Sequence, residues 1–463
     1  MKKPSAGIAS QVELKTIQPI SATERQGKIS DLFTIWFGSN IMMLSVITGS
    51  LAVCMFNLSF FTATAAVIVG NLAGAVFMAL HSAQGSQLGV PQMIQTRGQF
   101  GSYGALLVVT LVVIMYLGFF ASNLVLGGQG LHAICPPLSI NSGIAIVGVL
   151  SVTATAFGYN LIHTYTRIMS WLSGSALLLS FAWILLVNGL PETFFIHRPP
   201  TFAGFFGTMS IAALWQLAYA PYVSDYSRYM PENSHPRKVF WASYWGCSLG
   251  SIFPMILGVV IALCWNDSDI VTGLVTLTGG ASTLIVVIFS VGIAATNAMN
   301  LYCGTLCALT VGQTLAPSWS PRSGARIILA LGMFTLSLVL AVKGQGNFLV
   351  NYTHFILLLL YVLIPWTAIN LVDYYLIAHG NYHVPSFFRQ DGGIYGYFNL
   401  RAMACYLLGI LVQIPFIATD LYTGCIARAM GGADISWIVG LAVVCPAYYL
   451  MSKGIRASAH SPA

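Results

Sequence analysis

Charged residues are scarce in this sequence. Only 7% of its 463 residues are Asp, Glu, Lys or Arg, whereas 57% are hydrophobic and the mean hydropathy is +0.80. A water-soluble domain of this length needs far more polar side chains to cover its surface. The composition therefore excludes a soluble protein and predicts an integral membrane protein.

Long apolar runs make up most of the chain. A helix needs roughly 20 apolar residues to cross about 30 Å of hydrocarbon, and by this measure the sequence contains twelve spans. They are predicted at 31–57, 59–83, 104–130, 141–160, 167–189, 204–225, 237–265, 280–312, 324–344, 349–377, 401–419 and 434–452. No polar segment between them is long enough for a second domain, so we expect an all-α integral membrane protein with one membrane domain, 31–452.

The basic residues indicate the orientation of the chain. An even number of spans puts both termini on one side; with that side cytoplasmic, only Arg198, Lys343 and Arg428 of the 19 Lys and Arg residues lie outside. This agrees with the positive-inside rule, so the net charge of +7 reflects topology rather than a nucleic-acid partner. We expect a multi-pass protein of the cytoplasmic membrane.

The ends of the chain are polar. The first 30 residues carry no apolar core of a signal peptide. We predict a mobile cytoplasmic tail at 1–30 and a second cytoplasmic tail at 453–463.

Two spans carry residues that interrupt helices. The first contains Gly38, Ser39 and Asn40, followed by a second polar stretch at 48–50, and the sixth contains Pro221. Non-helical backbone at membrane depth is tolerated only where it is buried in protein or lines a cavity. For either span alone, the alternative is a local kink or close helix packing.

Interruptions in the first and sixth spans occupy corresponding positions in two sets of five. This arrangement is typical of an inverted five-helix repeat around a central binding site. We predict repeats at 31–189 and 204–377, followed by two further helices at 401–452.

Most of the notable polar side chains inside the spans are carboxamides, which are costly in a bilayer and suggest function. They are Asn40 in span one, Asn123 in span three, Gln216 in span six, and Asn297 and Asn300 in span eight. An amide offers a donor and an acceptor in one plane, which matches the edge of a nucleobase. Phe119, one turn before Asn123, can stack on the face of such a ring. The alternative is that these amides only join helices to one another.

Carboxylates are placed differently. Asp225 and Asp373 end spans six and ten at the inner side, where we expect helix capping or pairing with Arg or Lys. No carboxylate lies near the middle of a span, so a cationic substrate would lack a counter-ion. His354 is the one titratable group predicted to lie deep in a span. No catalytic or metal motif such as HExxH is present, so the sequence indicates no enzyme and no cofactor.

The segment between spans two and three is rich in glycine. Gly85, Gly89, Gly98, Gly101 and Gly104 flank a short amphipathic stretch. We predict a helix that lies along the inner membrane interface.

Five stretches carry further motifs, which follow one another along the chain. They are IWFGSNIMMLSVITGSL, LGVPQMIQTRGQFG, YAPYVSDYSRYMPE, TNAMNLYCGTL and PWTAINLVDYYLIAHGNY. Together they resemble the purine and cytosine permease branch of the nucleobase-cation symporter family one, from about residue 31 to about 400. The resemblance implies the leucine-transporter fold and symport of a nucleobase-like ring with a cation.

The resemblance also implies a substrate site on spans three, six and eight. It assigns Phe119 and Asn123 on span three, and Asn297 and Asn300 on span eight. On span six it implies an aromatic residue at the helix break, and either Trp215 or Tyr219 fits this role.

In sodium-coupled relatives, the ion lies between backbone carbonyls of span one and carbonyl and hydroxyl groups of span eight. Here this implies Gly38 and Ile41 with Thr296 as a candidate sodium site. Because Ala294 and Ala295 precede Thr296, hydroxyl ligands are few. The coupling cation therefore stays open between Na⁺ and H⁺.

We interpret the sequence as a secondary transporter that imports a neutral nucleobase, cytosine or a purine, by cation symport and alternating access. The expected partners are the nucleobase and membrane lipid, with no nucleic acid and no obligatory protein partner. The alternatives are a carrier for hydroxymethylpyrimidine, uracil, allantoin or a hydantoin, or a nutrient-sensing membrane receptor.

Overall fold

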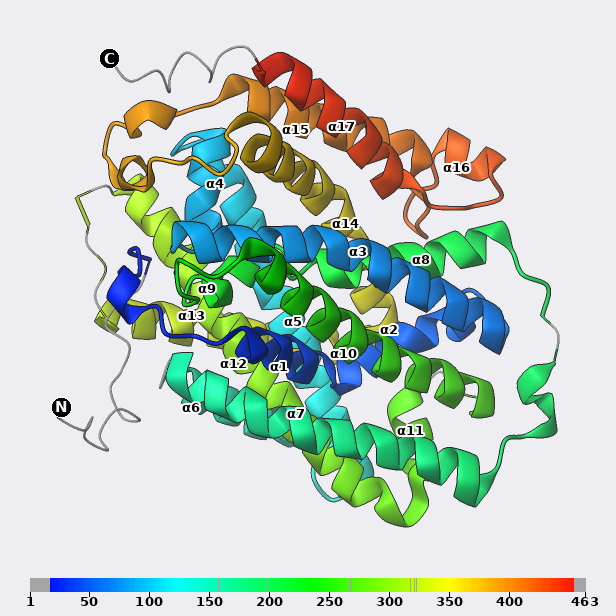
Figure 1. The fold of residues 1–463 in the computed structure, drawn as a ribbon. Helices are drawn as coiled ribbons and strands as arrows, with labels where there is room; N and C mark the ends of the chain where they lie inside the picture. The colour runs from blue at the N-terminus through cyan, green and yellow to red at the C-terminus, as the bar shows by residue number, and fades with distance from the viewer. Residues whose placement is uncertain are drawn as a thin grey trace.

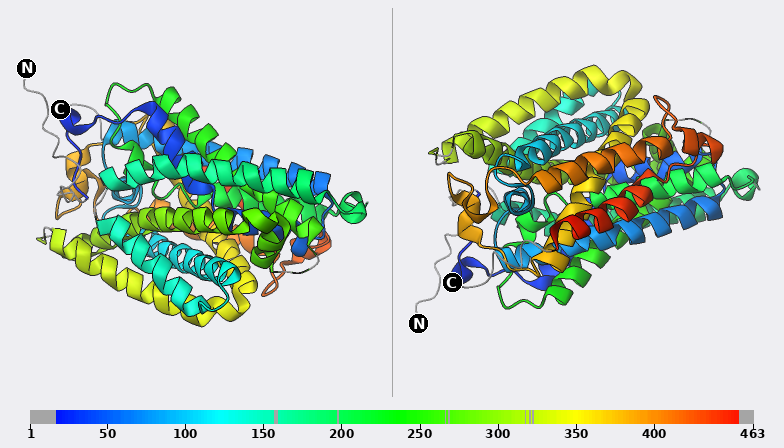
Figure 2. Two further views of the ribbon diagram at one scale, coloured as in Figure 1. Left: turned by 90° about the horizontal axis from the view of Figure 1, so that it is seen from below. Right: turned by 90° about the horizontal axis from the view of Figure 1, so that it is seen from above.

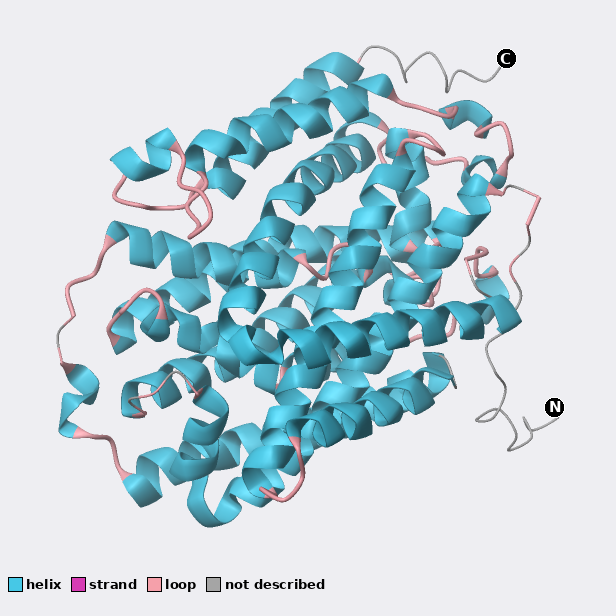
Figure 3. Ribbon diagram, turned by 180° about the vertical axis from the view of Figure 1, so that it is seen from behind, coloured by secondary structure: helices cyan, strands magenta, loops and turns pink. Residues whose placement is uncertain are grey.

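The computed structural model describes residues 17–453, apart from 157–158, 197, 266, 268, 317, 320 and 322 and the side chains of 154, 156, 159–166 and 323. Residues 1–16 and 454–463 of the two predicted tails lie outside this range. The described chain is helical, with no strand and one isolated bridge between Ala418 and Thr423 (Figure 3). The predicted all-α class is confirmed.

Each of the twelve predicted spans contains at least one helix. These helices are α1 (Ile29–Asn40) with α2 (Met43–Cys54), α3 (Phe60–Leu88), α5 (Ala105–Ile134), α6 (Ile140–Ala156), α7 (Tyr159–Ala182) with a π-helical end (Trp183–Asn188), α8 (Phe202–Leu217) with α9 (Val223–Ser227), α10 (Pro236–Cys264), α12 (Ser282–Leu315), α13 (Ser323–Gly344), α14 (Phe348–Val372) with a π-helical end (Asp373–Ile377), α15 (Leu400–Gln413) and α17 (Ser436–Ser452). The helices α4 (Gln92–Phe100), α11 (Ile270–Thr278) and α16 (Cys425–Ala429) lie between the spans (Figure 1).

Several of these helices are long enough for a bilayer. By length and composition, six helical stretches of the described chain could each cross a membrane, and the bent pair α1 and α2 makes a seventh. The longest stretch, Gly324–Ile377, contains both α13 and α14, and four shorter apolar helices accompany these stretches. The protein is therefore a multi-span membrane protein.

The first span is broken, as the sequence predicted. α1 ends at Asn40, α2 begins at Met43, and the two helices meet at an angle of 60°. The carbonyl of Asn40 accepts hydrogen bonds from the backbone of Met42, at 3.0 Å, and from the hydroxyl of Ser45. These bonds satisfy an acceptor that the helix break releases.

The second polar stretch of span one does not break the helix, because residues 48–50 lie within α2. Gly49 instead permits a close approach to α10: a Cβ at this position would lie 2.0 Å from the carbonyl oxygen of Met255. Gly258 does the same from α10, since its Cβ would lie 1.8 Å from the carbonyl oxygen of Val46. These glycines join the two helices, as small residues commonly do in membranes.

The sixth span is also broken. α8 ends at Leu217, residues 218–222 form turns, and α9 begins at Val223. The span predicted at 204–225 is thus interrupted around Pro221, as the sequence indicated, and consists of two helices joined by an irregular segment. A proline there removes a backbone N–H donor and clashes with the preceding turn.

The prediction of an amphipathic interfacial helix at α4 is half right. A helix is present, but all nine of its residues, Gln92–Phe100, are buried. In Figures 1 and 2, α4 lies at the end of the bundle where the described chain begins, together with the linker that follows α14. The helix is thus covered by protein rather than lying on lipid.

Arg97 anchors α4 to this end of α12. Its guanidinium donates to the carbonyl oxygens of Phe387, at 2.6 Å, and Thr310, at 3.2 Å. It also donates to the Thr314 hydroxyl, at 2.9 Å, and to the Gln313 side-chain oxygen, at 3.3 Å. Burial lowers the pKa of Arg97 to about 10, so the group stays charged at neutral pH.

The described part of the predicted N-terminal tail packs on the bundle. Ile17 and Ile20 are buried, and the backbone N–H of Ile20 donates to the carbonyl of Gly89 at 3.0 Å. The backbone N–H of Gly27 donates to the carbonyl of Tyr229 at the same distance. Residues 17–28 are therefore not a mobile tail, because these apolar side chains and backbone bonds hold them in place.

Replacing Arg97 with Lys should destabilise the protein. A single ammonium group cannot reach the separate acceptors that the planar guanidinium connects, so we expect a loss of about 2 kcal/mol or more. The measurement is the thermal unfolding midpoint of the purified protein in detergent. The matched control is Arg389→Lys, because Arg389 is exposed and pairs with the exposed Asp391. Equal midpoints for the two variants would contradict this role of Arg97.

Candidate functional site

A cavity lies where the two broken spans face each other. Its empty volume, which includes space open to the outside, is about 270 Å³, and it is lined by Met42, Phe119, Asn123, Trp215, Ala218, Tyr219, Tyr222, Thr296 and Asn300. These lining residues belong to the break in span one, to α5, to the interrupted region of span six and to α12. None of these lining residues is charged.

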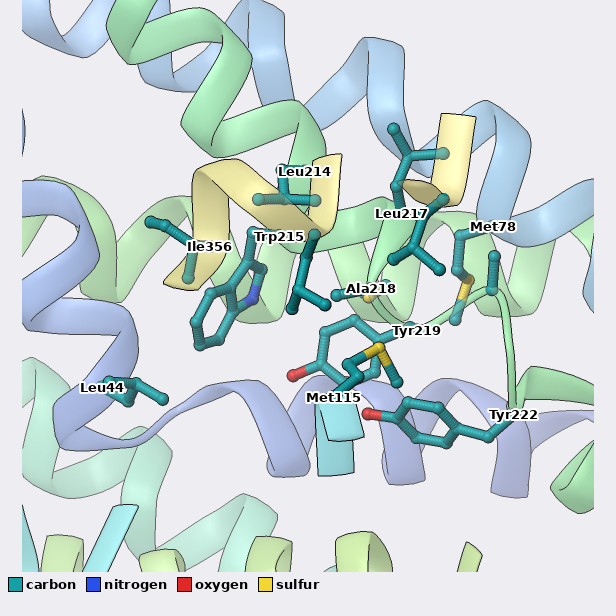
Figure 4. Packing of buried hydrophobic residues seen from close by; sticks show 14 of the residues in the cluster. Leu44, Met78, Met115, Leu214, Trp215, Leu217, Ala218, Tyr219, Tyr222 and Ile356 are labelled. Atoms are coloured by element: carbon teal, nitrogen blue, oxygen red, sulfur yellow. The ribbon is translucent and has the colours of Figure 1, made fainter. Parts of the chain in front are cut away.

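Aromatic rings form one side of the cavity. Trp215 lies in the last turn of α8, and Tyr219 and Tyr222 follow in the interrupted segment before α9 (Figure 4). The ring centroids of Phe119 and Trp215 are 6.2 Å apart, with the planes at 85°. Trp215 and Tyr219 both line the cavity, so the register left open by the sequence does not require a choice between them.

Two amides supply the cavity with polar groups. The Nδ2 of Asn123 donates to the Oδ1 of Asn297 at 2.9 Å, whereas the Oδ1 of Asn123 is buried without a hydrogen-bond partner. The side chain of Asn300 makes no hydrogen bond within the described part of the chain, and the residue is 4% exposed. A buried polar group without a partner costs free energy, so both amides are suited to a ligand.

Three predicted substrate residues do not line the cavity. The Oδ1 of Asn40 accepts from the indole N–H of Trp215, at 2.7 Å, and from the Ser251 hydroxyl, at 2.9 Å. The Nε2 of Gln216 donates to the Oδ1 of Asn71 at 2.7 Å, and Asn297 is turned toward Asn123. For these three, the alternative of amides that join helices describes the observed contacts, because their polar atoms face neighbouring helices.

Three of the lining residues were not predicted from the sequence. Met42 and Ala218 carry no polar group, so nothing in their chemistry marks them. Tyr222 follows Tyr219 at an interval of three, which is a signal that could have been used. Their exposure to the cavity depends on the irregular backbone at the two breaks.

Two of the three predicted cation residues, Ile41 and Thr296, lie where the end of α1 faces α12. The Thr296 hydroxyl donates to the carbonyl of Ser39, at the end of α1, at 3.0 Å. A Cβ on Gly292, one turn before Thr296, would lie 3.7 Å from the Ile41 carbonyl oxygen and 3.3 Å from the Ser173 hydroxyl. Ser173, on α7, is buried, and its hydroxyl oxygen has no partner. The missing side chain of Gly292 thus leaves a cradle between oxygen atoms, which fits a hard cation.

The contacts of the two aspartates at the inner ends of spans six and ten agree only in part with the predicted capping or pairing with Arg or Lys. Asp225 caps a helix as expected: its Oδ1 accepts from the first backbone N–H of α4, at Gln92, at 2.9 Å. Asp373 accepts from the hydroxyl groups of Tyr382 and Tyr448, the latter at 2.6 Å.

His354 is not deep in the protein. Its side chain is 23% exposed, and its Nε2 lies 3.6 Å from a carboxylate oxygen of the exposed Asp420. His81 on α3 is the more buried histidine, and it stacks on Trp366 with 4.9 Å between ring centroids. The prediction of His354 as the one deep titratable group is wrong, because that residue lies only two turns from the start of α14.

Two broken helices around an uncharged aromatic and amide cavity define a membrane carrier for a small solute. The sequence profile of the permease family for cytosine, purines, uracil, thiamine and allantoin matches residues 19–440. The chain belongs to this permease family, which confirms the resemblance found in the sequence and extends it into the last two spans.

Individual relatives agree with this assignment. The chain is 43% identical to a putative purine-cytosine permease of Bacillus subtilis (strain 168), over 96% of both chains. It is 24% identical to a purine-cytosine permease of Emericella nidulans, over 94% of this chain and 87% of the relative.

Solved structures show the same fold. The nucleobase-cation-symport-1 transporter Mhp1, closed with bromovinylhydantoin bound, superposes with a TM-score of 0.73 at 17% identity, over 95% of each chain. A Na⁺-coupled sialic acid symporter gives a TM-score of 0.60 at 12% identity, over 95% of this chain and 92% of the other. The leucine-transporter-like fold is therefore confirmed.

Replacing Asn40 with Ala should lower stability. The change leaves the buried indole N–H of Trp215 and the hydroxyl of Ser251 without their common acceptor, at a cost of about 1–3 kcal/mol for each group. Asn300→Ala is the matched control, because this amide has no bond to lose within the described chain. The thermal unfolding midpoint in detergent distinguishes the two variants. An Asn40→Ala midpoint equal to that of Asn300→Ala would show that Asn40 does not join the helices.

Proposed function

We propose that this permease imports cytosine or a purine across the cytoplasmic membrane, by cation symport and alternating access. One observation supports this substrate class above the others. The cavity between the broken spans combines aromatic faces with two amides, of which Asn123 has a buried oxygen without a hydrogen-bond partner, and has no charged lining residue. A flat, neutral heterocycle needs these two kinds of contact, stacking and planar hydrogen bonding.

The proposed roles follow from the contacts. Phe119 and Trp215 offer ring faces for stacking. The indole N–H of Trp215 already donates to Asn40, so only the ring of Trp215 is left for the substrate. Asn123 and Asn300 hydrogen-bond the base, and Tyr219 and Tyr222 complete the wall. The names of the two relatives described above support this substrate class, since one is called a putative purine-cytosine permease and the other a purine-cytosine permease.

We also propose that the membrane domain consists of two inverted repeats, 31–189 and 204–377, with both chain termini in the cytoplasm. Each repeat begins with a broken helix, α1 with α2 and α8 with α9. The cavity lies between these two breaks, so a movement of one repeat against the other would open it to either side.

Uptake into proteoliposomes tests the substrate. Labelled cytosine, adenine or hypoxanthine should be taken up saturably and show counterflow, and Asn300→Ala should weaken affinity by about 5- to 150-fold, the equivalent of about 1–3 kcal/mol. The change of Phe119 to Trp should be tolerated. Uptake of uracil, allantoin or a hydantoin alone would instead establish the related heterocycle carrier. Binding without uptake would indicate a receptor.

We infer that Na⁺ is the coupling cation. The carbonyl oxygens of Gly38 and Ile41 and the hydroxyls of Thr296 and Ser173 would hold it, in the cradle beside Gly292. A bound cation there ties α1 to α12 and α7, and thereby favours one arrangement of the two repeats. Proton coupling through His354 has weaker support, because that side chain does not line the cavity and lies 3.6 Å from the carboxylate of the exposed Asp420.

Variants of the cradle test the cation. Ser173→Ala or Thr296→Ala should raise the Na⁺ concentration needed for half-maximal uptake about tenfold, since each removes an oxygen ligand of a cation that prefers oxygen. Ser180→Ala is the control, because Ser180 is a buried serine of the same helix α7 that bonds only to the carbonyl of Ala176. Uptake that a pH gradient drives without Na⁺, and that His354→Gln abolishes, would rule out sodium coupling.

A further inference from the structure

The orientation of one amide beside the cavity is decided by a backbone carbonyl. The Nδ2 of Asn297 donates to the carbonyl oxygen of Phe120, on α5, at 3.2 Å. A carbonyl can only accept a hydrogen bond, so the amide nitrogen of Asn297 must face it. The oxygen of Asn297 is then directed to its other polar neighbour.

That neighbour is Asn123. The Oδ1 of Asn297 accepts from the Nδ2 of Asn123 at 2.9 Å. If Asn123 were turned over, two amide oxygens would face each other and a buried donor would lose its partner, which is unfavourable. The carbonyl of Phe120 therefore fixes Asn297, and Asn297 in turn fixes Asn123.

The remaining polar atom of Asn123 is its Oδ1. It is buried and has no hydrogen-bond partner, and Asn123 lines the cavity. This position thus presents an acceptor and not a donor. Asn300, the other cavity amide, makes no such bond in the described chain, so it can present either its oxygen or its nitrogen by rotation.

We propose that Asn297 is a positioning residue that fixes Asn123 as a hydrogen-bond acceptor, so that the cavity selects heterocycles with an N–H group at this point. The inference rests on the proposed function of the cavity. A base that presents a ring nitrogen lone pair or an oxygen there would place two acceptors against each other. A site built around a specific hydrogen bond rejects such analogues strongly.

A second pair of amides has the same arrangement away from the cavity. Asn71 donates to the carbonyl of Val67, at 2.9 Å, and its Oδ1 accepts from the Nε2 of Gln216, at 2.7 Å. The Oε1 of Gln216 is likewise buried without a partner. Because Asn71 and Gln216 do not line the cavity, Asn71→Ala is a matched control for Asn297→Ala.

The test measures binding to the purified protein with pairs of ligands that differ in one group that carries N–H, either an amino group or a ring N–H. Adenine is compared with purine and with 9-methyladenine, and cytosine with 2-hydroxypyrimidine and with 1-methylcytosine. In the wild-type protein, at least one of these losses should weaken binding by about tenfold or more. In Asn297→Ala the same penalty should fall below about threefold, since the released Asn123 can rotate. In Asn71→Ala it should stay at the wild-type value.

A conservative variant separates positioning from general damage. A buried, protonated carboxyl group can donate to Phe120 and accept from Asn123, so Asn297→Asp should keep the wild-type penalty. This arm also tests the inference if Asn297→Ala does not fold, because loss of the penalty in a folded Asn297→Asp protein would contradict it.

The outcomes distinguish this inference from the proposed function. Wild-type protein that binds none of the bases would overturn both. Wild-type protein that binds them, together with an Asn297→Ala variant that keeps the full penalty, would overturn the role of Asn297 and leave the proposed function intact. A similar reduction of the penalty in Asn71→Ala would show that the effect is a general consequence of losing a buried amide.

Discussion

Backbone polar groups that a helix break releases inside a bilayer must find partners within the protein, since lipid offers none. In this molecule the breaks of spans one and six lie opposite each other, and residues of both line one cavity together with residues of α5 and α12. At the end of α1, the carbonyls of Ser39 and Asn40 accept from Thr296 and Ser45. The same constraint thus creates the cavity and orients carbonyl oxygens beside it.

Close packing makes the broken first span possible. Gly49 and Gly258 bring α2 and α10 into backbone contact, and Asn40 links α1 to Trp215 of α8 and to Ser251 of α10. These contacts leave the ring of Trp215 exposed to the cavity and engage its only polar group. The polar side chains therefore divide into those that join helices and those left for a ligand.

The end of the bundle that holds α4 is connected to both sides of the cavity. Asp225, which follows the break of span six, caps the first turn of α4, and Arg97 ties the last turn to the end of α12. α12 also carries Thr296 and Asn300. The broken segment and α12 are therefore joined by hydrogen bonds through one short buried helix.

The sequence by itself determined the membrane class, the twelve helical spans and the break in each of spans one and six, because apolar length and helix-breaking residues are local properties. It also determined that amides and aromatics supply the polar chemistry, and six of the eleven predicted site residues line the cavity. Only the tertiary structure decided that Asn40, Gln216 and Asn297 bond to other helices, that α4 is buried, that Tyr222 lines the cavity and that the Ser173 hydroxyl lies beside Gly292. The reason is physical: which atom of an amide faces a ligand depends on the partners that neighbouring helices bring to its other atoms, as the carbonyl of Phe120 does for Asn297.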